Sequence, residues 1–151
     1  MRTILFFALA FLSINTYAQG SAKQVTWTSS AKKIGDNLFE VRLTADIKGD
    51  YHMYAQAAGV EGPVPTTIKF TPNPLITLNG KVKEAGKLIN KYEEAWEGKV
   101  NYYEKRVEFI QVVKLKTKVK TALAGKVEFM VCNDTQCLPP AEFDFRVALG
   151  G

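Results

Sequence analysis

Hydrophobic and polar residues alternate along several stretches of the chain. Within the stretch from Leu38 to Ile47, the odd-numbered positions are apolar, whereas the even-numbered positions from Glu40 to Asp46 are polar. The same period of two recurs at residues 127–131 and 143–149, and this period is typical of half-buried β-strands. Residues 107–115 are apolar on both faces, which favours a central strand. Shorter strand candidates are residues 25–29, 51–55, 66–70 and 80–84.

Turn-forming residues separate these stretches. Glycine, proline, asparagine and aspartate gather at residues 35–37, 48–50, 59–65, 72–74 and 79–80, and a further Ala-Gly pair stands at 124–125. No segment shows a convincing helical period. Seven to nine short strands with frequent turns predict an all-β protein, an antiparallel β-sandwich.

The first 18 residues have the three parts of a secretion signal. Arg2 gives a positive start, Ile4 to Ile14 form an apolar run, and small residues precede a cleavage point that we place after Ala18. The run is too short to span a bilayer comfortably. We therefore expect residues 1–18 to be a signal peptide and residues 19–151 to be one exported domain, periplasmic or secreted, without stable membrane insertion.

The formal net charge of +5 comes mainly from lysines at polar strand positions. Lys114, Lys116, Lys118 and Lys120 alternate along one predicted strand and its turn, a pattern typical of edge strands that resist aggregation. Arginines interleaved with stacking aromatic residues are absent from the sequence. We therefore expect no nucleic-acid partner.

Cys132 and Cys137 are the two cysteines of the chain, with four residues between them. A lone, closely spaced pair in an exported protein predicts a disulfide. A loop this short adds only about 2 kcal/mol of stability through chain entropy, so the pair suits redox chemistry as well as a structural role. One histidine and two thiols do not complete a tetrahedral set, so no metal and no diffusible cofactor are expected.

Residues near the pair have more than one interpretation. Asp134, between the cysteines, carries a negative charge that disfavours a thiolate; it could instead take up a proton during exchange, or serve only as a turn residue. Pro139 and Pro140 fix the direction of the chain and either leave the pair on an open edge or simply end the loop. Trp96 stands in an acidic loop, residues 92–99, and so large a ring must cover something.

Three stretches resemble the amino-terminal periplasmic domain of the thiol:disulfide interchange protein DsbD family. They are the cysteine-to-proline stretch 127–140, the strand 49–54 and the acidic loop 93–99. The resemblance implies an immunoglobulin-like fold and a thiol–disulfide oxidoreductase component that relays electrons. It implies as partners thioredoxin-like periplasmic proteins or a membrane electron transporter of the DsbD type, with disulfide isomerases and cytochrome c maturation proteins among the substrates.

The resemblance also implies roles for single residues. Cys137 would form mixed disulfides and Cys132 would resolve them. The acidic loop 93–99 would act as a cap, in which Trp96, beside Glu94, would shield the pair. Tyr54 and His52 would line the site, where protonated His52 would favour a thiolate. The best-known members have five residues between the cysteines, so this chain departs from their loop length.

A second interpretation of the residues stays open. The disulfide could merely shape a surface loop of a non-enzymatic binding module whose contact patch is the aromatic stretch 92–103. A hydrolase is not supported, since no paired carboxylates stand at catalytic spacing.

Overall fold

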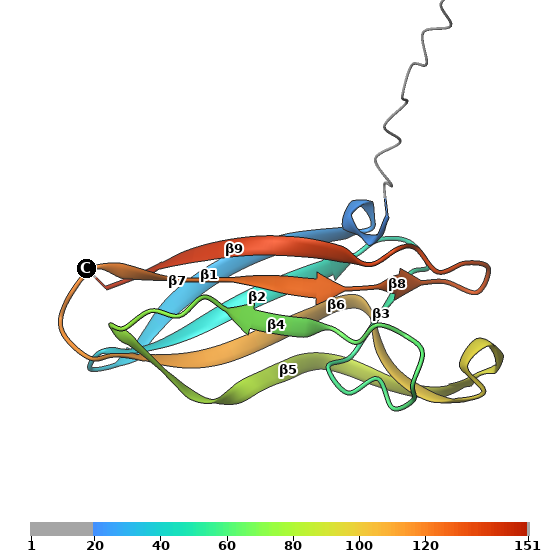
Figure 1. Ribbon diagram of the computed structural model, residues 1–151, viewed down its shortest axis with the longest axis horizontal. Helices are drawn as coiled ribbons and strands as arrows, with labels where there is room; N and C mark the ends of the chain where they lie inside the picture. Colours follow the sequence, from blue (N-terminus) through green and yellow to red (C-terminus); the bar gives the residue numbers. More distant parts are fainter. Residues whose placement is uncertain (1–19, 151) are drawn as a thin grey trace, which may run out of the picture.

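The structure is a computed structural model that describes residues 20–150 (Figure 1). The predicted signal peptide lies outside these residues. The described part of the chain contains nine strands and two single-turn 3-10 helices: η1 (Ser21–Lys23), β1 (Val25–Gly35), β2 (Leu38–Ile47), β3 (His52–Tyr54), β4 (Thr67–Phe70), β5 (Ile76–Glu93), η2 (Glu94–Trp96), β6 (Gly98–Leu115), β7 (Thr121–Phe129), β8 (Val131–Cys132) and β9 (Ala141–Leu149). Within residues 20–150, no helix has the length and apolar character needed to cross a bilayer.

The larger sheet is organised around β6. All its strand pairs are antiparallel, and β5 runs along one side of β6 for almost its full length. On the other side, β2 pairs with the second half of β6 and the short β3 pairs with the first half. β1 then extends the sheet beyond β2, and β8 extends it beyond β3. The cysteine segment is therefore the outermost strand at one corner of this sheet.

The second sheet is smaller and packs face to face with the first. It has the order β4-β7-β9, again antiparallel, and it lies over β1, β2 and β6 in Figure 1. Side chains from both sheets fill the main core, including Val41, Phe109 and Phe129, each 1% exposed. Trp27 of β1 joins the sheets, because its ring stacks on Phe143 of β9 with the centroids 5.2 Å apart. The predicted all-β antiparallel sandwich is confirmed.

Strand alternation predicts the core strands well and the long strands poorly. β2 has the predicted bounds, and its odd-numbered residues from Val41 to Ile47 are buried. β5 and β6 are much longer than the predicted stretches 80–84 and 107–115. Their extensions reach past the main core to a smaller buried cluster around Tyr54 and Tyr102, where Val100 of β6 and Ile89 of β5 pack.

The predictions of a lysine-bearing edge strand and of two of the turns are wrong. Lys114 does not stand on an edge strand, because β6 is hydrogen-bonded to β2 and β5 on its two sides; Lys116, Lys118 and Lys120 lie in the turn that follows. Asn79 and Gly80 lie inside β5 rather than in a turn, and Gly125 lies inside β7. A Cβ there would lie 2.7 Å from Phe145 and would overlap the carbonyl oxygen of Lys69 on β4, so this glycine permits close approach of β4 and β9.

Candidate active site at the cysteine hairpin

The two cysteines face each other across a narrow hairpin. The Asn133 N–H donates to the Gln136 carbonyl (2.9 Å), the Leu138 N–H donates to the Val131 carbonyl (3.0 Å), and the cysteines form an antiparallel bridge between these bonds. They are joined by a disulfide, with Cα atoms 4.0 Å apart. The predicted disulfide is therefore present, on a hairpin at the edge of the larger sheet.

Asn133 holds the turn of this hairpin. Its Oδ1 accepts from the backbone N–H groups of Thr135 (3.0 Å) and Gln136 (2.9 Å), and its Nδ2 donates to Asp50 (3.1 Å). Asp134 stands at the exposed tip of the turn. The turn-holding role suggested for Asp134 therefore belongs to its neighbour, because an Asn amide oxygen reaches N–H groups two and three residues ahead.

The two sulfurs have different surroundings. Cys132 is 2% exposed, because β8 pairs with β3 and the residue packs in the cluster around Tyr54 and Tyr102. Cys137, on the returning arm of the hairpin, is exposed. Behind the hairpin, the buried Ser21 hydroxyl donates to the Pro139 carbonyl (2.8 Å) and accepts from the Val131 N–H (3.1 Å). One cysteine is therefore anchored in the sheet, whereas its partner faces solvent.

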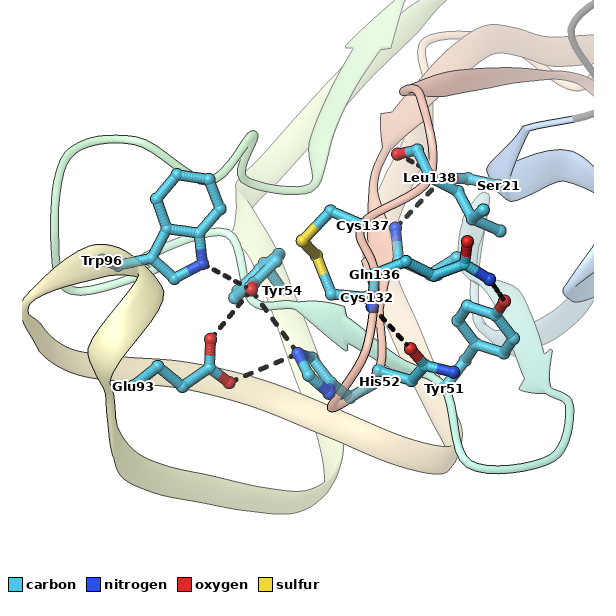
Figure 2. The surroundings of a disulfide bond; sticks show 12 residues. Ser21, Tyr51, His52, Tyr54, Glu93, Trp96, Cys132, Gln136, Cys137 and Leu138 are labelled. Carbon is cyan, nitrogen blue, oxygen red and sulfur yellow. Dashed lines mark hydrogen bonds and ion pairs between the residues drawn. A yellow bond between two sulfur atoms is a disulfide. The ribbon is translucent and has the colours of Figure 1, made fainter.

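β3 connects the hairpin to the loop that contains Trp96. His52 stands opposite Cys132 in the strand pairing and is 7% exposed. Two residues along, the Tyr54 hydroxyl donates to Glu93 Oε2 (3.0 Å) and accepts from the Trp96 indole N–H (2.8 Å). Glu93 Oε1 lies 3.3 Å from His52 Nε2. We call these four side chains the Tyr54 network; Figure 2 shows the sulfur–sulfur bond on the side of the hairpin that faces it.

The cap, residues 94–97, is also held by packing. The loop that follows β3 passes against it, and a Cβ on Gly62 would lie 2.5 Å from the six-membered ring of Trp96. A Cβ on Gly98 would likewise overlap Val60 of this loop. Gly62 has φ of +124°, a conformation that side-chain-bearing residues rarely adopt. The position of Trp96 therefore depends on a glycine more than 30 residues earlier in the chain.

A cleft of about 530 Å³ separates the cap from the cysteine hairpin. Its lining includes Trp96, both cysteines, His52 and Tyr102. Carboxylates surround this space: its lining includes Asp50, Glu93, Glu94, Glu104 and Asp134. The lysines in the lining are Lys91 and Lys105. A partner group can therefore enter beside Cys137, and it meets a largely acidic surface there.

Burial determines the ionisation of the groups inside. Desolvation lowers the pKa of His52, although the carboxylates of Glu93, Glu104 and Asp134 oppose that change. Burial likewise raises the pKa of Tyr54 and of Tyr102. At neutral pH His52 is therefore mainly neutral and the tyrosines keep their protons. The thiolate support expected from a protonated His52 is correspondingly weak at that pH.

The residues named from the sequence converge on one corner of the fold. Cys132, Cys137, His52, Trp96, Asp134 and Glu94 all line the cleft. Tyr54 lies behind this lining, 0% exposed, and acts through its hydroxyl. Glu94 is exposed, and the carboxylate that bonds Tyr54 belongs to Glu93. Glu93 was missed because β5 was predicted too short; extending its alternation from Ile89 places Glu93 on the same inward face.

Comparison with known proteins gives a consistent result. The family described as thiol:disulfide interchange protein DsbD, N-terminal, matches residues 20–148. Among curated proteins, none matches the chain.

Several solved structures are similar to the chain. The reduced DsbD N-terminal domain of Neisseria meningitidis is 19% identical, with a TM-score of 0.54 over 85% of this chain and 88% of that one. The N-terminal periplasmic domain of ScsB from Proteus mirabilis is 16% identical, with a TM-score of 0.53 over 83% of this chain and 44% of that one. A complex between the DsbD N-terminal and PilB N-terminal domains of Neisseria meningitidis is 16% identical, with a TM-score of 0.48 over 80% of each chain. The first two share the sandwich, which confirms the immunoglobulin-like fold.

Proposed function

The chain belongs to the family of DsbD N-terminal domains, and on this premise we propose that it relays electron pairs between partner proteins through Cys132 and Cys137. Thiol–disulfide exchange is the chemistry of the family, and the disulfide lies where a protein partner can reach it. The observation that carries the proposal is the unequal exposure of the two cysteines.

This asymmetry supports the following order of exchange. A partner thiolate attacks the exposed Cys137 Sγ, a mixed disulfide forms, and the electron pair of the broken bond leaves on Cys132 Sγ, which then takes up a proton. The second thiolate of the partner then attacks the partner's first sulfur in the mixed disulfide and releases the Cys137 thiolate, which takes up a proton. The partner dithiol is thereby oxidised to a disulfide and this domain is reduced to a dithiol. The reverse sequence reduces a disulfide substrate.

The fold is suited to both redox states because the disulfide contributes little to it. The bridge closes a loop within one hairpin, which by chain entropy is worth only about 2 kcal/mol. Neither cysteine belongs to the main core between the sheets. The hairpin is held separately, by the Asn133 turn and by Ser21. The hairpin should therefore keep its place when the sulfur–sulfur bond opens.

Family membership supports the partners and the compartment that we propose. The proposed partners are thioredoxin-like periplasmic proteins or a membrane electron transporter of the DsbD type. The proposed location is the periplasm, reached by the signal peptide at residues 1–18, with residues 19–151 as the mature domain. Cytochrome c maturation is one pathway that such a relay would serve.

The test is a pair of single-cysteine variants. Cys132→Ala leaves the exposed thiol without its resolving partner, so we expect it to remain folded and to accumulate mixed disulfides visible on non-reducing gels. Cys137→Ala is the matched control, which removes the same number of sulfurs but leaves only the buried thiol, and it should form few adducts. An unfolded Cys132→Ala protein, or equal adducts from both variants, would refute the relay.

A further inference from the structure

The charge around the disulfide is opposite in sign to the charge of the chain. The chain carries a formal net charge of +5, yet five carboxylates and two lysines line the cleft. One of these lysines, Lys105, donates its ammonium to the Gly49 carbonyl (2.8 Å) at the rim. Glu93, Glu104 and Asp134 all raise the pKa of both His52 and Tyr102, and Lys91 opposes them at His52.

The compensating positive charge lies at the other end of the sandwich. The β1–β2 and β6–β7 turns lie at the end opposite the cap and the cysteine hairpin (Figure 1). Lysines gather near these two turns, at Lys32, Lys33, Lys114, Lys116, Lys118 and Lys120. The molecule is therefore an electric dipole along its long axis, with the disulfide at the negative end.

Such a distribution acts on approaching molecules. A charged cleft with low-dielectric walls concentrates ions of opposite charge and orients the encounter, raising association rates by 10- to 1,000-fold in favourable cases. The effect favours partners with positive charge around the reacting group and disfavours negative ones. The acidic residues do not define the site, which the disulfide and the exposed Cys137 already mark. They determine which partners reach it fast.

We propose that the cleft selects redox partners whose reactive cysteine lies within a basic, lysine- or arginine-bearing surface. This inference rests on the proposed relay and adds the chemical class of its partner. Positive side chains flanking the incoming thiol would lie against Glu94, Glu104 and Asp134 while its sulfur reaches Cys137. Because all three residues are exposed, their interactions are screened by salt, and the selection should fade at high ionic strength.

The test uses three synthetic dithiol peptides with one cysteine spacing, flanked by lysine, glutamine or glutamate. Each reduces the oxidised, full-length domain, and acid quenching with alkylation and mass spectrometry gives second-order rate constants at 10 mM and 500 mM NaCl. We expect the lysine peptide to react about 10-fold faster than the glutamate peptide at low salt, where screening extends about 30 Å, and the ratio to approach one at high salt.

Matched variants localise the effect. Glu94→Gln with Glu104→Gln removes two cleft charges outside the Tyr54 network and should reduce the lysine-to-glutamate rate ratio at least twofold. The control pair, Asp36→Asn with Asp144→Asn, removes the same charge from two exposed positions outside the cleft and should leave that ratio unchanged. An equal effect of both pairs would show that net charge, not the cleft, is responsible, and would overturn the inference.

The outcomes separate this inference from the function beneath it. If the glutamine peptide forms a mixed disulfide at Cys137 while the lysine and glutamate peptides react equally at low salt, the partner class is wrong and the relay stands. If no peptide forms a mixed disulfide at Cys137, the relay fails and the inference fails with it.

Discussion

Replacement of Tyr54 by phenylalanine tests whether hydrogen bonds hold the cap beside the disulfide. The Tyr54 hydroxyl accepts the Trp96 indole N–H (2.8 Å) and donates to Glu93 (3.0 Å), while the ring itself is 0% exposed. Phenylalanine keeps the ring and removes both bonds, together with the longer contact of the hydroxyl with His52 Nε2 (3.5 Å). The change therefore removes the hydrogen-bonded link between the cap and β3 and keeps the ring that fills the cluster.

The magnitude follows from the two bonds. A hydrogen bond to a charged group contributes about 1.5–3 kcal/mol and a neutral one about 0.5–1.5 kcal/mol. Glu93 keeps its contact with His52 at 3.3 Å and is partly solvated, so the loss of its bond to Tyr54 should cost about 1.5 kcal/mol, the lower limit of the range. We expect a total loss of about 2.5 kcal/mol in the free energy of unfolding. The share of the Trp96 bond, about 1 kcal/mol, corresponds to roughly fivefold more frequent opening of the cap.

Two measurements read these effects separately. Urea denaturation of the oxidised protein gives the free energy of unfolding, and hydrogen exchange of the indole N–H by NMR reports on Trp96. The indole N–H of Trp27 is an internal reference, since it is buried in the sandwich away from the cap. Tyr51→Phe is the control variant, because it removes one exposed hydrogen bond, to Gln136 (2.9 Å), and should cost about 0.5 kcal/mol or less.

The expected pattern is specific to the cap. Tyr54→Phe should lower stability well beyond Tyr51→Phe and should speed exchange of the Trp96 indole N–H without changing that of Trp27. Equal stabilities of the two variants, together with unchanged exchange at Trp96, would refute the role given to the Tyr54 network.

Three further predictions concern the same corner. Gly62→Ala adds a methyl group 2.5 Å from Trp96 at φ of +124° and should lower the free energy of unfolding by about 2–4 kcal/mol in a denaturation experiment. The control Gly49→Ala, with nothing within 4 Å of the new methyl group, should lower it by only about 1 kcal/mol, and equal losses would argue against close packing of the cap. Trp96→Ala should speed iodoacetamide labelling of the reduced thiols, and an unchanged rate would remove the shielding role. Because burial lowers the folded-state pKa of His52 below 6.5, the unfolded state binds more protons than the folded state as the pH falls, so stability drops below about pH 6.5 with a slope of at most about 1.4 kcal/mol per pH unit. In denaturation experiments at pH 5–8, the stability difference between wild type and His52→Gln should therefore shrink toward pH 5, and a pH-independent difference would contradict this prediction.

The sequence predicts the site residues better than it predicts how they are connected. Cys132 and Cys137 stand out as a pair, and residues 51–55, which include His52 and Tyr54, are a short strand candidate. The partners of this strand cannot be read from its own residues, because β3 lies between β6 and β8, whose pairing depends on the whole sheet. The contact of Glu93 with both β3 side chains results from that pairing.

The strand ends show the same limit for the fold. β2 is predicted to the residue because one face meets the main core along its whole length. β5 was predicted too short because most of its residues are exposed, and because a register shift between Asn79 and Lys83 interrupts its alternation. The role of Gly62 was equally invisible, since a glycine in a loop predicts a turn and says nothing about the indole ring that packs on it.

The reduction potential of the Cys132–Cys137 pair tests the central claim most directly. Equilibration with glutathione buffers, followed by alkylation, gives the potential, and circular dichroism of both redox forms reports on the fold. The account predicts a potential less negative than about −300 mV, with the reduced domain still folded. A potential well below that value, or a reduced form that loses its β-structure, would show that the disulfide is structural and would contradict the account.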